Sequence, residues 1–139
     1  IHFSKKVECD VENVRVPSMI LQPVVENAVN HGIRNIDWEG HINLSVERWD
    51  DHIEISVRDN GLGMTREQIE RVLSKKVHSS AGEGDSTGIG MNNVISRLEL
   101  YYECDGLMEI YSEGEGMGTE VVINIPLERS EKNVQNPAC

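Results

Sequence analysis

Six consecutive residues combine one carboxylate with two closely spaced glycines: Asp59-Asn60-Gly61-Leu62-Gly63-Met64. They follow an apolar segment that alternates like a β-strand. A carboxylate at a strand end can accept hydrogen bonds from a ring amino group, and glycines let the backbone approach a planar or anionic ligand closely. Asp-Asn-Gly is also a common turn sequence. Taken alone, the motif therefore indicates either a ligand pocket or an ordinary turn.

A second glycine pair, Gly88-Ile89-Gly90, follows a Ser- and Gly-rich stretch and opens a segment of helical periodicity. Free N–H groups at the start of a helix favour phosphate, and glycine lets a phosphate come near. The alternative is an ordinary helix start with Ser86 or Thr87 as its cap. Lys75 and Lys76 in the preceding stretch could reach outer phosphates or form a solvated charge pair.

A third polar cluster is expected along one helix. Glu26, Asn27, Asn30 and His31 fall at helical spacing opposite an apolar stripe. An ordinary solvated helix face is the alternative, although Asn is a poorer surface helix former than Lys, Arg or Glu. Amide oxygens are good ligands for hard cations, and Mg²⁺ takes one or two protein oxygens together with phosphate and water. The pattern therefore indicates Asn27 as a metal-side residue.

The elements that must position these motifs alternate between strand and helix patterns. Strands are expected at 2–8, 42–47, 53–58, 107–111 and 120–125, with a short extended piece at 14–17. Helices are expected at 18–31, at 65–73 and at 90–101. Residues 74–87 lack periodicity and predict a mobile loop. The sum predicts an α/β two-layer sandwich, with a mixed, mostly antiparallel sheet of about five strands covered by about three helices.

Single residues set the expected helix limits. Pro23 predicts either a kink in the first helix or its true start, and Gly32 predicts its C-terminal cap. Thr65 is expected to cap the second helix, with Gln68 as its capping-box partner.

Length and composition predict one domain at residues 1–127 and a polar tail at 128–139. No apolar run is long enough to span a membrane, and the first residues lack both a Met and the apolar core of a signal peptide. We therefore expect a piece of a longer protein with no membrane contact of its own. The net charge of −11, without a basic cluster, argues against nucleic-acid binding. Cys9, Cys104 and Cys139 are far apart and are expected to be unpaired thiols.

Other nucleotide-binding motifs are absent from the sequence. There is no Gly-x-x-x-x-Gly-Lys-Ser/Thr loop and no protein-kinase motif set. A dinucleotide fingerprint would need a third glycine where Arg66 and Asn93 stand.

In this order the motifs resemble the ATP-binding domain of bacterial sensor histidine kinases. That domain has the Bergerat (GHKL) fold shared with gyrase, heat-shock chaperone ATPases and mismatch-repair ATPases. The likeness is greatest to the LytS/YesM-like branch and runs from about Val16 to Leu127. It is carried by Val16-Pro17, residues 21–32, the glycine boxes 59–64 and 88–94 with Arg97-Leu98, and the closing strand 118–121 with Pro126.

The resemblance implies ATP and Mg²⁺ as cofactors and a role for each site residue. Asp59 would accept the adenine amino group, and Asn27 would hold the metal. Residues 74–87 would form a lid over the bound nucleotide. The remaining nucleotide-binding residues implied are Gly61, Gly63, Met64 and Thr119 around the base, Asn30 and His31 near ribose and phosphates, and Thr87, Gly88, Ile89, Gly90 and Met91 near the phosphates.

One departure bears on the reaction. Hydrolytic relatives carry a water-activating glutamate four residues before the metal-binding asparagine, and Pro23 stands there. Transfer to a residue supplied elsewhere is therefore favoured over hydrolysis, and Glu26 would orient the acceptor imidazole. His2 lacks the neighbours of an acceptor histidine, so we place the acceptor outside this chain.

The resemblance thus implies the catalytic domain of a two-component sensor histidine kinase, which donates the γ-phosphate of Mg·ATP to a histidine on its own dimerisation domain. Its partners would be that domain in a homodimer and a response regulator. It would be the cytoplasmic part of a membrane-anchored bacterial kinase. A non-catalytic ATP-binding module and an anti-sigma-type serine kinase are the alternatives.

Overall fold

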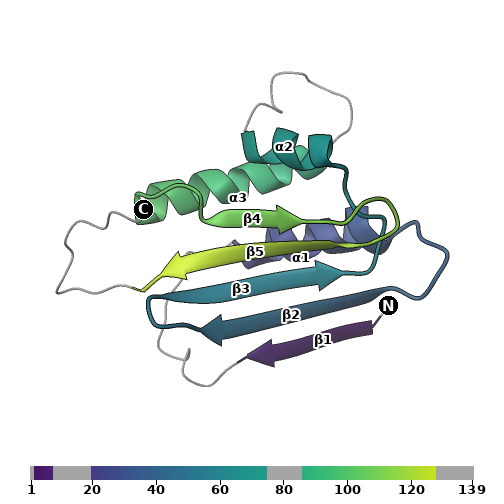
Figure 1. Ribbon diagram of the computed structural model, residues 1–139, viewed down its shortest axis with the longest axis horizontal. Coiled ribbons are helices and arrows are strands. Elements are labelled where there is room, and N and C mark those ends of the chain that lie inside the picture. The colour runs from purple at the N-terminus through teal and green to yellow at the C-terminus, as the bar shows by residue number, and fades with distance from the viewer. Residues whose placement is uncertain (1, 8–19, 75–85, 128–139) are drawn as a thin grey trace.

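The structure, a computed structural model, describes residues 2–7, 20–74 and 86–127 of the 139-residue chain. The order of elements along the chain is β1 (His2–Val7), α1 (Leu21–Asn27), η2 (Ala28–Ile33), β2 (His41–Arg48), β3 (His52–Asp59), α2 (Arg66–Ser74), α3 (Ser86–Tyr102), β4 (Met108–Tyr111) and β5 (Thr119–Pro126). Figure 1 shows one sheet with the helices against one of its faces. The prediction of a two-layer α/β sandwich is confirmed.

The five strands form a single mixed sheet in the order β1-β2-β3-β5-β4. β1 and β2 pair in parallel, and the β2–β3, β3–β5 and β4–β5 pairs are antiparallel. The hairpin of β2 and β3 around residues 49–51 matches the alternation read from the sequence. Strand β1 lies at one edge, and its six residues are all exposed.

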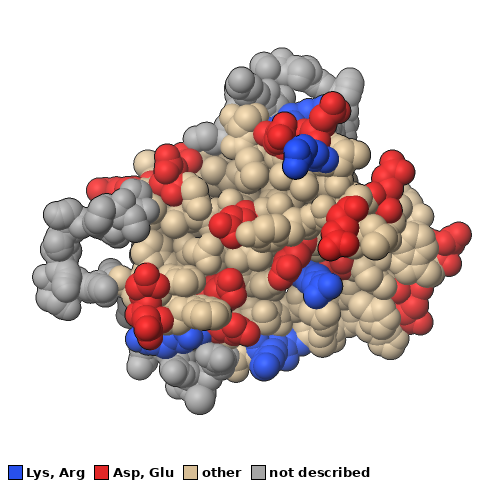
Figure 2. All heavy atoms as spheres, in the orientation of Figure 1, with Lys and Arg blue, Asp and Glu red and all other residues tan. Residues whose placement is uncertain are grey.

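Alternation along β3 determines which face of the sheet the Asp59 side chain occupies. Ile53, Ile55 and Val57 on β3 are buried against the helices, while the residues between them face the uncovered side. Asp59 continues the buried series by one more step of two residues, so its side chain also faces the helix layer. Acidic side chains and a few basic ones are scattered over the face shown in Figure 2, among residues that carry neither charge.

The helices bury their apolar faces on the sheet and on one another. Val94 and Leu98 of α3 are almost fully buried, as is Val24 of α1. α3 contacts both α1 and α2, so the first and second helices are held at a defined distance across it.

The first helix begins near Pro23, which was one of the two predictions for this residue. Pro23 stands in the first turn of α1, where its missing N–H removes no helical hydrogen bond. The prediction that Gly32 caps the helix is wrong, because the chain continues as a π-helical segment to Ile33. Gly32 is instead required by crowding: a Cβ there would lie 2.7 Å from the Asp59 carboxyl carbon.

The second helix follows its predicted capping box. Thr65 N–H donates to Gln68 Oε1 (2.9 Å), and Gln68 N–H donates to Thr65 Oγ1 (3.1 Å). The third helix starts earlier than predicted, at Ser86 instead of Gly90. The extended piece at 14–17, most of the predicted loop at 74–87 and the tail at 128–139 lie outside the described residues.

Two further expectations concern the whole fragment. Among the described residues, no helix has the length and apolar character needed to cross a membrane. The expectation of unpaired thiols is wrong for Cys104, which is disulfide-bonded. Cys9 and Cys139 lie outside the described residues.

Candidate functional site

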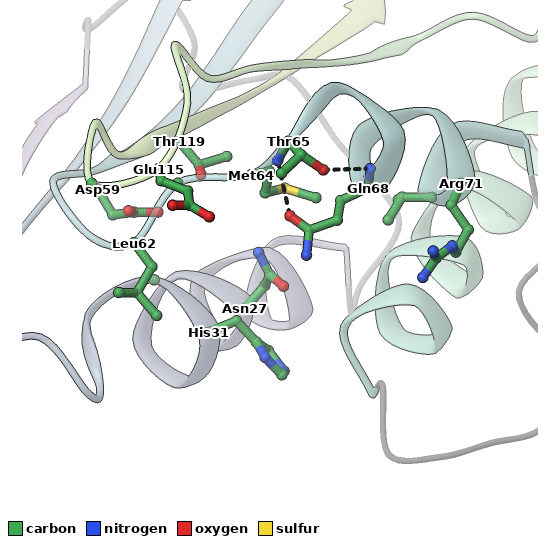
Figure 3. A pocket seen from close by; sticks show the side chains of 14 residues that line it. Asn27, His31, Asp59, Leu62, Met64, Thr65, Gln68, Arg71, Glu115 and Thr119 are labelled. Carbon is green, nitrogen blue, oxygen red and sulfur yellow. Dashed lines mark hydrogen bonds between the residues drawn. The ribbon is translucent and has the colours of Figure 1, made fainter.

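A cavity of about 710 Å³ opens between the first helix, the second helix and the loops at one end of the sheet. That volume is within the range of small-molecule sites. Figure 3 shows side chains from distant parts of the chain facing it. Its lining residues are Asn27, His31, Gly32, Asp59, Leu62, Gly63, Met64, Thr65, Gln68, Arg71, Val72, Glu115, Gly116 and Thr119.

Asp59 is the buried carboxylate of the cavity, with 5% of its surface exposed. Burial raises the pKa of its carboxyl above the ordinary value, while backbone N–H groups of Gly61 and Thr119 act in the opposite direction. The Gly61 N–H lies 2.8 Å from Asp59 Oδ1. Thr119 is the cross-strand partner of Asp59 and is itself buried. A carboxylate held in this way presents a fixed acceptor to a ligand.

Asn60, the next residue, faces away from the cavity. Its Nδ2 donates to the Glu39 carbonyl (3.0 Å), and its Oδ1 accepts from the His41 N–H (2.7 Å). Asn60 thus ties the motif to the segment before β2, while Asp59 lines the cavity.

The glycines of the first motif are required by the close approach of main chains. A Cβ on Gly61 would lie 1.8 Å from the Gly32 carbonyl oxygen. The same carbonyl accepts the Leu62 N–H at 2.8 Å. Gly63 has a φ of +80°, a conformation that favours glycine. Gly63 lines the cavity, whereas Gly61 lies buried beneath it, so Gly61 shapes the pocket through the backbone.

The loop between β4 and β5 is joined to this glycine motif by hydrogen bonds. The N–H of Gly116 donates to the Leu62 carbonyl (2.7 Å), and the N–H of Met64 donates to Ser112 Oγ (3.0 Å). These bonds hold Glu115 at the same end of the cavity as Asp59 (Figure 3).

The first helix contributes Asn27 and His31, which lie one turn apart and both line the cavity. Glu26 and Asn30 are exposed and are not among the lining residues. Glu26 accepts a hydrogen bond from Gln22 Nε2 (2.9 Å). The predicted polar stripe is thus divided, with one pair directed to the cavity and the other outward.

The oxygen Oδ1 of Asn27 is buried and has no hydrogen-bond partner among the residues that the structure describes. A buried acceptor without a partner is costly, and a hard cation would satisfy it. The described residues contain no group of three His, Cys, Asp or Glu side chains suited to a metal. Mg²⁺ usually takes one or two protein oxygens and completes its coordination with phosphate oxygens and water, so a single amide oxygen suits it.

The second glycine motif is described only in part. Thr87, Gly88 and Ile89 belong to the first turn of α3, but their side chains lie outside the described part of the structure. A Cβ on Gly90 would meet nothing within 4 Å. Met91 is buried in the hydrophobic core and is not among the residues that line the cavity.

Eight lining residues are not among the site residues predicted from the sequence: Gly32, Leu62, Thr65, Gln68, Arg71, Val72, Glu115 and Gly116. Helical spacing contained a usable signal for Gln68 and Arg71, which lie three residues apart on α2 and so share a face. For Glu115 no sequence signal existed, because only the folded loop brings it to the cavity.

Comparison with known proteins agrees with this geometry. Residues 16–129 match the family described as histidine kinase-, DNA gyrase B-, and HSP90-like ATPase. The chain is 34% identical over 125 residues to sensor histidine kinase YpdA of Escherichia coli, a match that covers 85% of this chain and 19% of that protein. It is 30% identical over 132 residues to sensor protein LytS of Staphylococcus epidermidis, covering 95% of this chain and 21% of LytS. The chain thus spans about a fifth of the length of these relatives.

Solved structures show the same fold at lower identity. The catalytic domain of histidine kinase ThkA aligns with a TM-score of 0.60 at 22% identity, covering 90% of this chain and 79% of that one. The mycobacterial sensor histidine kinase MprB aligns with a TM-score of 0.60 at 19% identity, covering 90% and 80%.

Proposed function

Because the chain belongs to the histidine kinase-, DNA gyrase B- and HSP90-like ATPase family, we propose that it is the catalytic domain of a sensor histidine kinase. In this proposal it binds Mg·ATP and transfers the γ-phosphate to a histidine on a separate domain. The observation that supports it most is that one cavity is lined by both the buried Asp59 and Asn27, whose buried Oδ1 has no hydrogen-bond partner within the described part of the chain.

The base would lie at the Asp59 end of the cavity. There the carboxylate accepts a hydrogen bond from the adenine amino group, and Thr119 lies beside it as a second polar group. Guanine presents an oxygen at the same position, which a carboxylate repels. The site should therefore prefer ATP to GTP, since a mismatched polar group would remain unpaired.

The phosphates would lie nearer to Asn27, His31 and the start of α3. Asn27 Oδ1 fits Mg²⁺ because it is buried and no described residue donates a hydrogen bond to it, and a bound cation would neutralise phosphate charge during transfer. Asn30 and the glycine motif of α3 remain predicted contributors to nucleotide binding.

Transfer is favoured over hydrolysis by the residue that precedes Asn27 by one helical turn. Pro23 stands there, and its side chain holds no group that could accept a proton from water. Glu26 is exposed beside Asn27, where a docking domain could meet it. We assign to Glu26 the orientation of the acceptor imidazole.

The partners in this proposal lie outside the chain. They are the dimerisation domain that carries the acceptor histidine in a homodimer, and a response regulator that receives the phosphoryl group. The longer protein would be anchored in the membrane, with this domain in the cytoplasm.

The experiment is a transfer assay with ATP labelled at the γ-phosphate. The chain is incubated with Mg²⁺ and with a histidine-bearing dimerisation fragment taken from sensor histidine kinase YpdA. We expect label on that fragment, lost in acid as phosphohistidine is, and not formed when the fragment's histidine is replaced by Gln. The Glu26→Gln variant should keep ATP affinity but label the fragment more slowly.

Other outcomes identify the alternatives. ATP binding without label on the fragment would favour a non-catalytic nucleotide-binding module. Label that survives acid on a serine would indicate a serine kinase.

A further inference from the structure

The candidate nucleotide cavity has charges of opposite sign at its two ends. Asp59 and Glu115 lie close together at one end, and Arg71 lies at the other (Figure 3). Of the described residues that line the cavity, Arg71 is the one with a permanent positive charge. A ligand with an amino group at one end and negative charge at the other would fit this arrangement in a single orientation.

The helix that carries Arg71 is fixed at both ends. At its start, Thr65 and Gln68 form the reciprocal capping box. Near its end, Asn92 Nδ2 of α3 donates to the Val72 carbonyl (2.7 Å), and the Val72 side chain is buried. The backbone position of Arg71 is therefore well defined. Arg71 lies one helical turn beyond Gln68, on the face of α2 that borders the cavity.

We propose that Arg71 binds the terminal phosphates of the nucleotide and so sets its orientation in the cavity. This inference rests on the proposed ATP-binding function. The planar guanidinium can donate two parallel hydrogen bonds to one phosphate. The chain has a net charge of −11, so a polyphosphate entering the cavity needs a local cation to offset the repulsion. Arg71 already takes part in a polar interaction, which it exchanges for phosphate oxygens on binding.

The opposite orientation is disfavoured by the same charges. Phosphates placed beside Asp59 would meet two carboxylates, one of them buried, where repulsion is screened least. The base end and the phosphate end are thus distinguished by the charge of the protein itself.

The test compares Arg71→Gln with Arg66→Gln. Arg66 lies on the same helix but borders a different groove, between α2 and β4, so the control has the same change in charge. ATP binding with Mg²⁺ is measured by calorimetry, and adenosine binding by NMR titration. We expect Arg71→Gln to weaken ATP binding about 10- to 100-fold, as for the loss of a charge-assisted hydrogen bond. Adenosine affinity should change less than about twofold, because adenosine has no phosphate. Arg66→Gln should leave both ligands within about twofold of the original protein, because its charge lies outside the cavity.

A second variant separates geometry from charge. Arg71→Lys should recover part of the ATP affinity, because it keeps the charge but loses the planar fork. Equal weakening of ATP and adenosine by Arg71→Gln would indicate a structural role and overturn the inference, as would unchanged ATP affinity. If the unaltered chain binds neither ligand, the proposed function itself fails; if it binds both and Arg71→Gln changes nothing, only the role of Arg71 fails.

Discussion

Replacing Asp59 by Asn removes the buried charge of the cavity while it keeps the size of the side chain. The carboxylate is 5% exposed, and it accepts the Gly61 N–H at 2.8 Å. An adenine amino group would be a further donor to it. The net value of a hydrogen bond to a charged group is about 1.5–3 kcal/mol. We therefore expect Asp59→Asn to weaken ATP binding about 10- to 150-fold.

The same substitution should not destabilise the protein without nucleotide. The pKa of Asp59 in the folded state is raised above the ordinary value of an aspartate carboxyl, with burial as the largest cause. A raised pKa means that the folded state favours the protonated form. The contribution of this group to stability is thus fully present below the unfolded pKa and is lost as the pH rises through the folded pKa. Asparagine is neutral at every pH in this range, so the variant should not lose stability as the pH rises through the pKa of Asp59.

Two measurements check this prediction. Calorimetry with Mg·ATP gives the affinity, and guanidinium unfolding without nucleotide at several pH values from 4 upward gives the free energy of unfolding. Asp105→Asn is the control, because Asp105 is exposed and does not line the cavity. The free energy of unfolding of Asp59→Asn should match or exceed that of the original protein at neutral pH, and the difference should grow as the pH rises.

Two results would refute the reasoning about Asp59. ATP affinity equal to that of the original protein would show that the carboxylate does not receive the base. A fall in stability at neutral pH, absent from Asp105→Asn, would show that the charge mainly holds the Gly61 and Thr119 loops together.

Four further predictions concern single substitutions. Gly61→Ala should lower the free energy of unfolding by about 1–3 kcal/mol in chemical denaturation, because its Cβ would lie 1.8 Å from the Gly32 carbonyl oxygen. Gly90→Ala should raise the free energy of unfolding by about 0.5–1 kcal/mol, because a Cβ there meets nothing within 4 Å. Thr65→Ala should cost about 0.5–2 kcal/mol, because α2 loses its capping box, and hydrogen exchange should show the extra opening in α2 first. Glu115→Gln should raise ATP affinity about two- to fivefold at low salt, with the gain shrinking at high salt, because a carboxylate is removed from the cavity. Equal stability of Gly61→Ala and the original protein, α2 exchange unaltered by Thr65→Ala, or a salt-independent effect of Glu115→Gln would each contradict its prediction.

Much of the fold could be predicted because its signals are local. Period-two alternation located β2 and β3, and it also directed Asp59 to the helix layer. The capping box of Thr65 and Gln68 marked the second helix for the same reason, since both partners lie within one turn.

The rest depended on contacts between distant segments. The sequence predicts Gly32 as a helix cap. In the folded protein Gly32 lies against the Asp59 carboxyl group, which leaves no room for a side chain at position 32. The outward direction of Glu26 and the burial of Met91 follow from the packing of helices on the sheet. The place of Glu115 follows from hydrogen bonds between the β4–β5 loop and the glycine motif.

The most direct test of the nucleotide site is a crystal structure of this chain with Mg²⁺ and a non-hydrolysable ATP analogue. The account predicts the adenine amino group within hydrogen-bonding distance of the Asp59 carboxylate, with the phosphates toward Asn27 and Arg71. A nucleotide bound outside this cavity, or bound within it with its phosphates beside Asp59, would contradict the account.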